Sequence, residues 1–538
     1  MTAVHQHQLT NRIYRKNILN GPYDAIVIGS GIGGLATAAL LSKAGQRVLV
    51  LERHYVAGGF THTFSRKGYE WDVGIHYIGE VHRQRSILRR LFDFITDGAL
   101  EWSRMPEVYD RVIIAGDEYD YIAGVEAFKA RLCGYFPDEK KAVDEYVRLV
   151  FAATNAAKNF FSARAMPSWM RFPLKPVMTS PFLKYSRKTT REVISSLTSN
   201  AKLLGVLTAQ YGDYGLPPAR SSFAIHAMVA KHYFDGGNYP VGGSGRIAET
   251  IVPVIEKGGG KVLVRAEVKE VIVENGRAMG VRLENGDEIR AGSVVSDAGV
   301  FNTFGKLLDP ALARSLKLDR KLNQVKPSLA HICLYVGMKE SAANLGLNQA
   351  NYWIYPDYDH DKTIARYETD PSAPLPVTYI SFPSAKDPDW ERRHPGRATL
   401  EAIGFAPYKW FTSWEKTSWK KRGNDYEAFK EELTQRLLEQ VYRYLPQLRG
   451  KIDFCELSTP LSTRHFTNYG QGEIYGIEHT PERFELSWLK PQTPIRNLYL
   501  TGQDVVTDGI GGALFGGVLT ASVMLKRNLI KEVMRQTV

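Results

Sequence analysis

Residues 24–52 read DAIVIGSGIGGLATAALLSKAGQRVLVLE and contain a complete strand–turn–helix–strand unit. The unit begins with a short apolar run rich in β-branched residues, which is typical of a buried parallel strand. A glycine-rich turn, a run of good helix formers over 35–44 and a second apolar strand over 47–51 follow. Glu52 ends the unit, 21 residues after Gly31. The order of these parts predicts an α/β protein with a doubly wound sheet of the Rossmann type.

The glycines of the turn predict a dinucleotide site. Gly29, Gly31, Gly33 and Gly34 allow a tight turn and a close approach of the backbone to a pyrophosphate. The helix behind them presents unsatisfied N–H groups and the positive end of its dipole to the phosphates. A carboxylate at the position of Glu52 binds ribose hydroxyls and repels a 2′-phosphate, which disfavours NADP at this site.

Two further stretches carry matching features. Residues 260–299 alternate strand residues with Asn-Gly turns at 275–276 and 285–286, which is typical of a β-meander. Residues 497–501 form another short apolar strand, and a glycine-dense apolar segment follows over 509–521. Because glycine disfavours helix, we expect a ligand or another backbone to pack closely against this segment. Its N-terminus would direct a positive dipole end at a bound ligand.

The three stretches together resemble one protein family. The segments that carry the resemblance are Glu52-x5-Gly58-Gly59, residues 71–79, 237–243, 472–476 with His479, and 497–517. They are similar to those of the carotenoid desaturase–isomerase branch of the FAD-dependent amine oxidase superfamily, and most of all to those of the retinol saturases and carotenoid isomerases. The resemblance spans the chain from about residue 24 to residue 525.

The resemblance implies an FAD domain assembled from three separated stretches. The second glycine pair would let the backbone approach the flavin side of the pyrophosphate, and Asp504 would bind the ribityl chain. The residues expected to bind FAD are Gly29, Gly31, Gly33, Gly34, Glu52, Arg53, Gly58, Gly59, Gly74, Val268, Gly502, Asp504, Gly511, Gly512 and Ala513.

The expected domain order follows from the same stretches. An interleaved α+β substrate domain interrupts the FAD domain, and a helix over 426–444 is expected in it from the helical spacing of apolar and charged residues. The expected parts are an N-terminal extension (1–22), the FAD domain (23–85, 240–305 and 486–538) and the substrate domain (86–239, with a membrane contact, and 306–485).

The resemblance implies an oxidoreductase that acts on C=C bonds of a hydrophobic polyene, a retinoid or a carotenoid, by hydride transfer at flavin N5. The leading hypothesis is a reaction like that of a retinol saturase, and an isomerase or a desaturase on the same scaffold is the alternative. An amine or other small-substrate flavin oxidase, and a prenyl-lipid escort protein without redox chemistry, are further alternatives. The sequence indicates neither the electron donor or acceptor nor the oligomeric state.

Protein groups must then bind the polyene, exclude water and move one proton. The candidates for the catalytic site are His76, Tyr77, Tyr239 and Tyr475, and His465, Glu473 and His479 are further candidates for the proton transfer. His76 is preferred because its motif lies where the chain of the family passes the flavin. Each candidate could instead be a packed core residue with satisfied hydrogen bonds. No HExxH pattern, no Cys/His cluster and no supported GxSxG elbow occurs, so we expect neither a metal site nor a serine nucleophile.

The positive charge of the chain is concentrated in one segment. The sequence has 69 Lys and Arg against 57 Asp and Glu, a net charge of +12, and residues 146–191 contain nine basic residues and no acidic one. Bulky apolar residues lie between the basic ones, which suits a surface that dips into an anionic membrane interface. A basic loop with its apolar residues folded inward is the alternative, and nucleic acid is not expected because no binding module accompanies the segment. Prolines at 167, 173, 176 and 181 are expected to prevent a long straight helix.

The N-terminal region and the cysteines give two further expectations. Residues 1–22 lack the apolar core of a signal peptide, and no run of 18 or more apolar residues occurs. We therefore expect an intracellular protein without a transmembrane helix, peripheral on the cytoplasmic face of a membrane. Cys133, Cys333 and Cys455 are far apart in the sequence, which indicates neither a disulfide framework nor a structural zinc site.

Overall fold

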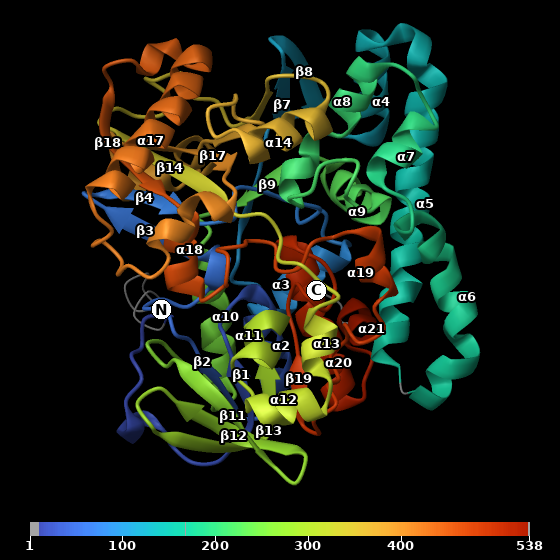
Figure 1. Ribbon diagram of the computed structural model, residues 1–538, viewed down its shortest axis with the longest axis vertical. Helices are drawn as coiled ribbons and strands as arrows, with labels where there is room; N and C mark the ends of the chain where they lie inside the picture. Colours follow the sequence, from blue (N-terminus) through green and yellow to red (C-terminus); the bar gives the residue numbers. More distant parts are fainter. Residues whose placement is uncertain (1–9, 167, 536–538) are drawn as a thin grey trace.

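The computed structural model describes residues 10–166 and 168–535; the side chains of residues 165 and 168–175 lie outside this description. Two large sheets lie one above the other in the view of Figure 1, with helices around both. Along the right edge of the view, α5 (Lys140–Ala165) and α6 (Ser168–Ser186) extend beside both levels. The lower sheet carries the glycine turn, and the upper sheet lies across a cavity from it.

The lower sheet is the doubly wound sheet predicted from the sequence. Its parallel part has the strand order β10-β2-β1-β13, with β19 also paired to β13, and β12 and β11 continue from β13 as an antiparallel meander. These strands come from the three stretches identified in the sequence, so the discontinuous α/β fold and the meander are confirmed. They are β1 (Tyr23–Ile28), β2 (Val48–Leu51), β10 (Lys261–Leu263), β11 (Val268–Glu274), β12 (Arg277–Leu283), β13 (Glu288–Ser296) and β19 (Leu498–Leu500).

Two helices from opposite ends of the chain pack together on this sheet. They are α2 (Ile32–Lys43), which follows the glycine turn, and α20 (Gly509–Leu525), the glycine-dense segment. A Cβ atom added at Gly517 of α20 would lie 2.6 Å from the Gly33 carbonyl oxygen, so only glycine allows the two backbones to come this close. Thr37 and Thr501 share a buried hydrogen bond of 2.9 Å across the same contact. The glycines of α20 therefore serve helix packing as well as the cavity.

The upper sheet has the strand order β18-β14-β17-β16-β15-β7-β8. Strand β14, the second in this order, is buried over its whole length, and α17 (Asn424–Tyr444) packs on its two neighbours β17 and β18 and on β16. This helix agrees with the one expected over 426–444. The strands are β7 (Val108–Ile114), β8 (Asp117–Ile122), β14 (His331–Met338), β15 (Asn351–Tyr355), β16 (Thr378–Ser381), β17 (Ala398–Phe405) and β18 (Ile452–Ser458).

Smaller sheets and further helices complete the described fold. The short strands are β3 (Thr63–Arg66), β4 (Tyr69–Asp72), β5 (Ile78–Gly79), β6 (Trp102–Arg104) and β9 (Gly237–Pro240). The other helices used below are α3 (Ile87–Ile95), α4 (Val125–Tyr135), α7 (Thr190–Ser195), α9 (Phe223–Tyr233), α10 (Arg246–Lys257), α11 (Val300–Gly305), α14 (His360–Thr369), α15 (Pro383–Lys386), α18 (Pro460–Thr467), α19 (Pro481–Glu485), α21 (Leu529–Arg535) and the 3-10 turn η4 (Ala209–Asp213).

Two expected domain limits cut through packed elements. The apolar face of α3 lies in the core of the lower, dinucleotide-binding half, although α3 falls in the expected substrate part that begins at residue 86. β9 pairs with both β5 and β6, and the limit between residues 239 and 240 divides this strand. The packing of α3 and the pairing of β9 therefore give better domain limits than the order of motifs along the chain.

The basic segment is helical nearly throughout. α6 runs as one helix through Pro173, Pro176 and Pro181, so these three prolines do not interrupt the helix as expected. The segment is nevertheless divided into α5 and α6 on either side of Pro167, which lies outside the described residues. Each proline removes only one backbone hydrogen bond, and α6 packs against α5 and α9, which supplies tertiary support for the helix. Of the bulky residues between the cations, Phe160 and Phe182 are buried with ring centroids 4.3 Å apart, whereas Val177 is 75% exposed. Trp169, Met170, Arg171, Phe172, Leu174 and Lys175 have side chains outside the described part.

Within the described ranges, no single helix is long and apolar enough to cross a membrane. α20 and α21 satisfy the criteria of length and composition only as a pair, and they are bent by 105° relative to each other.

Candidate active site

One cavity of about 1940 Å³ connects the glycine turn with the upper sheet. Its wall includes Gly29, Gly31 and Glu52 at the lower end, and His76 and Tyr475 at the upper end. Pockets that hold a single small ligand usually measure about 300–1,000 Å³. The cavity therefore has room for a dinucleotide and for a second ligand beside it.

The glycine turn forms a cradle in which side chains do not fit. A Cβ atom at Gly33 would lie 2.4 Å from the Cα atom of Gly502, and one at Gly31 would lie 2.6 Å from the Asp297 carboxylate. At Gly34 a Cβ atom would lie 2.4 Å from the Gly29 carbonyl oxygen. The turn therefore brings bare backbone and the N-terminus of α2 to the cavity wall, which is the arrangement that binds phosphate groups.

Glu52 ties the cradle to the second glycine pair. Its carboxylate accepts hydrogen bonds from the Ser30 backbone N–H at 2.9 Å, the Ser30 hydroxyl at 2.7 Å and the His54 backbone N–H at 2.7 Å. The Ser30 hydroxyl oxygen in turn accepts from the Gly58 backbone N–H at 3.0 Å. This network holds the end of β2, the first turn and the second glycine pair in one geometry around the lower end of the cavity.

Arg53 closes the same end of the cavity. Its guanidinium forms an ion pair of 3.0 Å with Glu267 and donates to the carbonyl oxygens of His465 and Phe466 at 2.7 and 2.9 Å. The lower end is therefore joined to the last turn of α18 by an arginine, and Val268 at the start of β11 completes this wall.

The C-terminal stretch supplies the opposite wall. The Asp504 carboxylate accepts from the backbone N–H groups of Val300 at 2.8 Å and Ile477 at 3.2 Å, and burial raises its pKa. α20 begins directly afterwards, and its first turn contributes Gly511, Gly512 and Ala513 to the wall. A Cβ atom at Gly512 would lie 2.3 Å from the Thr507 carbonyl oxygen, so the tight start of α20 requires this glycine.

The predicted cofactor residues divide into two groups in the structure. The cavity wall contains Gly29, Gly31, Gly33, Glu52, Arg53, Gly59, Gly74, Val268, Asp504, Gly511, Gly512 and Ala513. Gly34, Gly58 and Gly502 lie behind this wall, where they allow close backbone packing. Gly502, with a φ of +80°, would place a Cβ atom 2.2 Å from the Asp297 carboxylate. These three glycines shape the cradle from outside the cavity.

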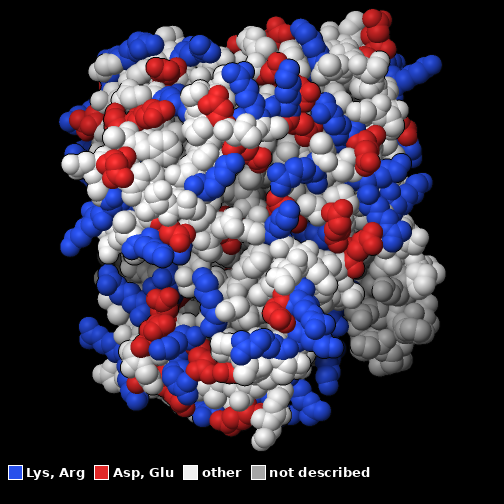
Figure 2. Space-filling model, in the orientation of Figure 1, with Lys and Arg blue, Asp and Glu red and all other residues white. Residues whose placement is uncertain are grey.

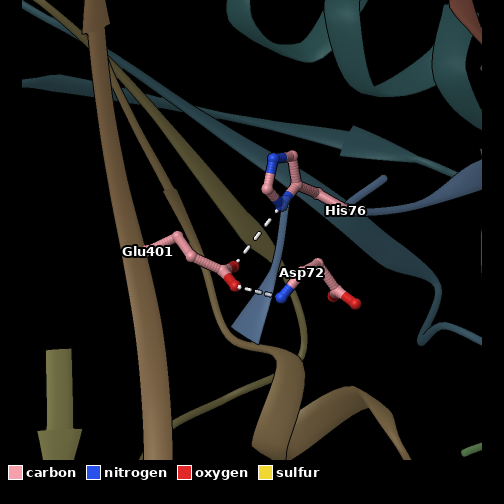
Figure 3. Close-up of side chains that lie close together, drawn as sticks. All are labelled: Asp72, His76 and Glu401. Atoms are coloured by element: carbon pink, nitrogen blue, oxygen red, sulfur yellow. Dashed lines mark hydrogen bonds and ion pairs between the residues drawn. The ribbon is translucent and has the colours of Figure 1, made fainter. Parts of the chain in front are cut away.

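His76 lies in the cavity wall and contacts a buried glutamate. Its Nδ1 atom is 3.4 Å from Oε2 of Glu401, which projects from the middle of β17 (Figure 3). Burial lowers the pKa of His76 to about 4 and raises that of Glu401 to about 8. Both groups are therefore uncharged at neutral pH, and the contact is a close approach of two neutral side chains.

Tyr77 bridges two buried carboxyl groups on the other side of the chain from His76. Its hydroxyl lies 3.0 Å from Asp110 Oδ2 and 3.2 Å from Asp213 Oδ2, and its ring stacks on Tyr233 with centroids 4.2 Å apart. Burial, followed by the charge of Asp110, raises the pKa of Asp213 well above its ordinary value. Asp213 lines the cavity and is therefore a neutral, hydrogen-bonding acid in an apolar chamber.

The other two tyrosine candidates take different positions. Tyr475 lines the cavity, and its hydroxyl donates to the Gly212 carbonyl oxygen at 2.9 Å. Tyr239 is buried outside the cavity wall, where its hydroxyl donates to Asp72 Oδ2 at 2.6 Å. The structure thus brings His76, Tyr77 and Tyr475 to one chamber and leaves Tyr239 behind it.

The further proton-transfer candidates lie outside the cavity wall. His479 is fully buried and approaches Asp508 at 3.4 Å, while His465 stacks on Trp419 with centroids 5.1 Å apart. Burial raises the pKa of Glu473, whose side chain accepts from the Gln471 backbone N–H at 2.8 Å. The surroundings of His465, Glu473 and His479 therefore indicate a structural role for each of them.

Apolar side chains form most of the upper chamber. They come from α9, from strands β15 to β17 and from the loop before α19, and they enclose the space beyond His76. Long apolar ligands fit chambers of this composition, with a few polar groups to orient them. The lining apolar residues include Ile225, Met228, Val229, Tyr233, Trp353, Tyr379, Ile403, Phe405, Ile474 and Tyr475.

One face of α5 continues the wall toward solvent. Thr154, Ala157, Lys158, Phe161, Ser162 and Met166 line the cavity at helical spacing. Lys158 and Ser162 are exposed, as are Lys526 and Arg527 at the bend between α20 and α21, so the cavity reaches the surface between these helices. A second set of exposed wall residues, Tyr55, Lys420 and Glu427, marks another opening.

The cations of the basic segment are partly neutralised by other parts of the chain. Arg148 pairs with Glu145, Arg187 with Glu485, and Arg191 with Asp359 and Asp361 on or beside α14. Blue side chains gather at the right edge of Figure 2, where α5, α6 and α7 meet in Figure 1. No ion pair is recorded among the described residues for the exposed cations of Lys158, Lys184 and Lys188, although the charge of Lys188 contributes to the lowered pKa of Glu192.

Comparison with known proteins gives the chain its family. The family described as flavin containing amine oxidoreductase matches residues 32–525. The chain belongs to the flavin-containing amine oxidoreductases. Among solved structures, this chain is similar in fold to putrescine oxidase, with a TM-score of 0.61 and 17% identity over 94% of this chain and 100% of that one. Cyclohexylamine oxidase from Brevibacterium oxydans gives a TM-score of 0.57 and 18% identity over 96% of this chain and 100% of that one.

Curated members of this family are more similar in sequence. All-trans-retinol 13,14-reductase of Danio rerio is 37% identical over 98% of this chain and 91% of its own length. A second Danio rerio protein, an inactive all-trans-retinol 13,14-reductase, is 36% identical over 97% and 89%. Prolycopene isomerase 1 of an Oncidium hybrid cultivar is 27% identical over 93% and 83%. A reductase and an inactive reductase are thus almost equally identical to this chain, so overall identity does not decide whether a member of the family is active.

A flavin cofactor fits the cavity of this family member. The bare glycine cradle accepts a pyrophosphate, and the N-terminus of α20 would place a positive dipole end beside the ring system, where the reduced form gains negative charge. Gly74 lies against Phe60, and a Cβ atom there would be 3.1 Å from Phe60 Cβ. This close packing keeps the wall between the cradle and His76 thin. Bound here, a flavin supplies hydride chemistry.

The structure also reveals buried groups that sequence reasoning missed. Asp297 ends β13 beside the cradle and burial raises its pKa to about 8; the strand that carries it was recognised, but the residue was not singled out. Glu401 and Lys386 lie hundreds of residues from His76 in the chain. A carboxylate in the otherwise apolar strand β17 was an available signal, because buried charges need partners.

Proposed function

We propose that this chain is an FAD-dependent oxidoreductase that reduces a C=C bond of a hydrophobic polyene, a retinoid or a carotenoid, as a retinol saturase does. The observation that carries the proposal is the single cavity that joins a dinucleotide cradle to a long apolar chamber. The named activity of the 37% identical relatives supports the polyene class. The prolycopene isomerases support isomerisation on the same scaffold as the second candidate.

FAD is the flavin that this cavity suits. Glu52 and Val268 stand where the ribose and adenine of a dinucleotide would lie, beyond the phosphate cradle. A flavin without the nucleotide half would leave this end of the cavity, with Arg53 and the Glu52 network, without a ligand. The described wall residues predicted from the sequence therefore support a dinucleotide.

In this proposal the residues of the chamber bind the polyene and move one proton. The apolar walls exclude water and align the chain of the polyene, and His76 delivers a proton to the carbon that does not receive hydride. Tyr475 and Tyr77 position the substrate, and the neutral Asp213 offers a hydrogen bond to a polar end group such as a hydroxyl. Tyr239 supports the site from behind through Asp72.

Anaerobic turnover tests the proposed reaction. Purified protein is incubated with a panel of retinoids and carotenoids, once oxidised and once after photoreduction, and the products are separated and weighed. A gain of two hydrogens with reduced flavin supports the saturase reaction. Unchanged mass with altered geometry supports an isomerase, and loss of two hydrogens with oxidised flavin supports a desaturase. Peroxide from amines would indicate an amine oxidase, and protein without flavin absorbance, even after FAD titration, would indicate a lipid escort.

We also propose that residues 146–191 contact an anionic membrane surface next to the cavity opening. The face of α5 that lines the cavity leads to exposed Lys158, and α6 carries exposed Val177 and Lys184. A polyene that partitions into a bilayer would thus meet the opening directly.

Vesicle binding tests the membrane contact. Lys158, Lys184 and Lys188 are replaced together by Gln, and binding to phosphatidylserine–phosphatidylcholine vesicles is compared with binding of the parent. Each lysine near an anionic surface contributes about 1 kcal/mol, so about 100-fold weaker binding is expected. Exposed Lys317, Lys409 and Lys416, replaced together, form the matched control and should bind normally. Equal binding of both triple variants would contradict the proposed contact.

A further inference from the structure

The contact between His76 and Glu401 is the centre of a buried polar cluster beside the chamber. Glu401 is fully buried and the His76 side chain is only 11% exposed. Neither His76 Nδ1 nor Glu401 Oε2 has a hydrogen-bond partner among the described residues, although the two atoms lie 3.4 Å apart and face each other (Figure 3). The other ring nitrogen, Nε2, lies on the far side of the imidazole from Glu401 (Figure 3).

The remaining polar atoms of the cluster are already engaged. Oε1 of Glu401 accepts from the Asp72 backbone N–H at 2.9 Å. The Asp72 carboxylate accepts from the Tyr239 hydroxyl at 2.6 Å and from the Ser244 backbone N–H at 3.0 Å. Ligand atoms of Asp72, His76 and Glu401 lie within 4.8 Å of one another, but both Asp72 oxygens have donors. The arrangement therefore suits proton exchange between His76 and Glu401 better than a cation.

A buried lysine faces the same glutamate. Lys386 of α15 donates to the His76 carbonyl oxygen at 2.9 Å, to the Ser381 hydroxyl at 2.8 Å and to the Asn351 side chain. Burial lowers the pKa of Lys386 to about 8, and the charge of Glu401 opposes this shift. A lysine held here stabilises a negative charge that appears on Glu401, which is the charge left when Glu401 gives up its proton.

We propose that Glu401 is the proton reservoir of the site and that it acts through His76. This inference rests on the proposed function. As hydride from the reduced flavin bonds to one carbon of the C=C, the Nε2–H of His76 gives its proton to the other carbon. Nδ1 of the same imidazole takes the proton of the Glu401 carboxyl group, so the ring stays neutral. The products are the saturated bond, the oxidised cofactor and a Glu401 carboxylate beside Lys386. One proton from water, taken up at Nε2 of His76 as the Nδ1 proton returns to Glu401, restores both groups.

The relay explains why His76 and Glu401 are both uncharged before the reaction. A protonated histidine would carry a full charge into an apolar chamber, whereas the relay moves that charge to Glu401 and its lysine, behind the wall. Glu401 is thus a positioning residue and His76 the catalytic one. The titratable groups that face Glu401 from the elements packed on it are Asp72, His76, Tyr239, Cys333, Tyr335, Tyr379 and Lys386.

The relay gives the reaction a defined pH dependence. Glu401 must hold its proton, so kcat should decrease as the pH rises through about 8, where this carboxyl group ionises. Cys333, Tyr239, Tyr335 and Tyr379 have pKa values raised well above their ordinary values by burial, and they stay neutral in this range. Asp72, with a pKa raised by burial to about 6, ionises at lower pH, so it does not produce this decrease. Lys386, with a pKa lowered by burial to about 8, loses its charge in the same range, so the decrease reports the Glu401–Lys386 pair, and Glu401→Gln shows the part that depends on the carboxyl group.

The test compares Glu401→Gln with a matched glutamate elsewhere. Glu401→Gln keeps the size of the side chain and an acceptor for the Asp72 N–H, but it cannot give up a proton. We expect normal flavin content and polyene binding, a KM close to that of the parent and a kcat at least about 100-fold lower, without the decrease near pH 8. Glu478→Gln removes another largely buried carboxyl group, one that pairs with Arg220 outside the cavity wall, and should leave kcat and its pH profile unchanged.

A double-variant cycle and a spectroscopic measurement complete the test. In a relay, His76→Gln and Glu401→Gln act on one step, so the double variant should be no slower than His76→Gln alone. If Glu401→Gln does not fold, Glu401→Asp should keep the decrease near pH 8 at a lower rate. Asp297, whose pKa burial also raises to about 8, contributes to infrared spectra of both proteins. The spectrum of the parent minus that of Glu401→Gln should therefore show one protonated carboxyl band that titrates near pH 8.

The outcomes separate the relay from the proposed function. If the parent reduces a polyene but Glu401→Gln behaves like Glu478→Gln, the relay is refuted and the saturase reaction stands. If the parent reduces no polyene, the proposed function fails, and the relay as a step of that reaction fails with it, while the infrared band still reports the proton on Glu401. If the spectrum of the parent minus that of Glu401→Gln contains no protonated carboxyl band at pH 7, the proposal is overturned in every case.

Discussion

Replacing Gly33 by Ala should damage the cofactor site by forcing apart the two stretches of chain that form the cradle. The added Cβ atom would lie 2.4 Å from the Cα atom and 2.8 Å from the N atom of Gly502, and 2.7 Å from the Asp297 carboxylate. Ordinary van der Waals contact begins near 3.4 Å, so α2 and the stretch after β19 have to separate by about 1 Å. The contacts are mainly backbone, and no flexible side chain can move aside.

The expected loss of stability follows from the close packing of α2 against the stretch after β19. Extra methyl groups in a close-packed interior destabilise proteins by about 1–3 kcal/mol. The same separation moves the N-terminus of α2 away from the phosphates, so we expect a similar loss in the free energy of cofactor binding, or about 5- to 150-fold weaker binding. The assay is FAD titration of the apoprotein by fluorescence quenching, together with urea unfolding of the same sample.

Gly134→Ala is the matched control for this change. Gly134 lies on the exposed side of α4, where a Cβ atom would meet nothing within 4 Å. Alanine in a helix should stabilise the fold by about 0.5–1 kcal/mol and leave FAD binding unchanged. If Gly33→Ala bound FAD as tightly as Gly134→Ala, the close contact between the cradle and Gly502 would not be needed for the site, and the reasoning would be refuted.

Three further predictions concern other parts of the site. Glu52→Gln removes a charged acceptor of three hydrogen bonds, each worth about 1.5–3 kcal/mol, so FAD titration should show at least tenfold weaker binding; unchanged affinity would exclude a role for the carboxylate. Tyr77→Phe leaves Asp110 and Asp213 without their shared donor and should lower the free energy of unfolding by about 1–3 kcal/mol, measured in urea, while a loss below 0.5 kcal/mol would contradict the bridge. Burial raises the pKa of Glu401 and Asp297 to about 8, so the folded apoprotein holds protons that the unfolded chain has released. The free energy of unfolding should therefore decrease from pH 6.5 to 8 by up to about 1.4 kcal/mol per pH unit and group. Urea midpoints at the two pH values check this, and Glu401→Gln should have the smaller decrease.

The sequence predicts the lower half of the molecule well because its signals are local. A buried strand, a glycine turn and a helix follow one another over 24–44, and the Asn-Gly turns of the meander lie next to the strands that they join. The glycine turn and the end of β2 bring the N-terminal cofactor candidates to the cavity wall. The strand–turn–helix unit and each hairpin of the meander depend on residues within about 30 positions of one another.

The polar cluster of the upper chamber depends on distant residues, and its members could not be found together from the sequence. His76 belongs to a recognisable motif, but Lys386 and Glu401 reach it only because β4 packs on β17 and α15 also packs on β17. The prolines of α6 led to a wrong expectation for a related reason. Packing against α5 and α9 stabilises this helix although its prolines cannot donate backbone hydrogen bonds. Tertiary contacts between distant segments determine both the polar cluster and the helical structure of α6.

The contact between Thr37 and Thr501 has a consequence for biosynthesis. The two residues are 464 positions apart, and Thr501 lines the cavity while Thr37 holds it from behind. At about 5–20 residues per second, a ribosome needs about 20 to 90 s to make the intervening chain. During that time β13 lacks its partner β19, and α2 lacks the helix that covers it. The cofactor can therefore bind its complete site only after nearly all of the chain has emerged, and a cell that makes this protein has to shield an unfinished sheet until then.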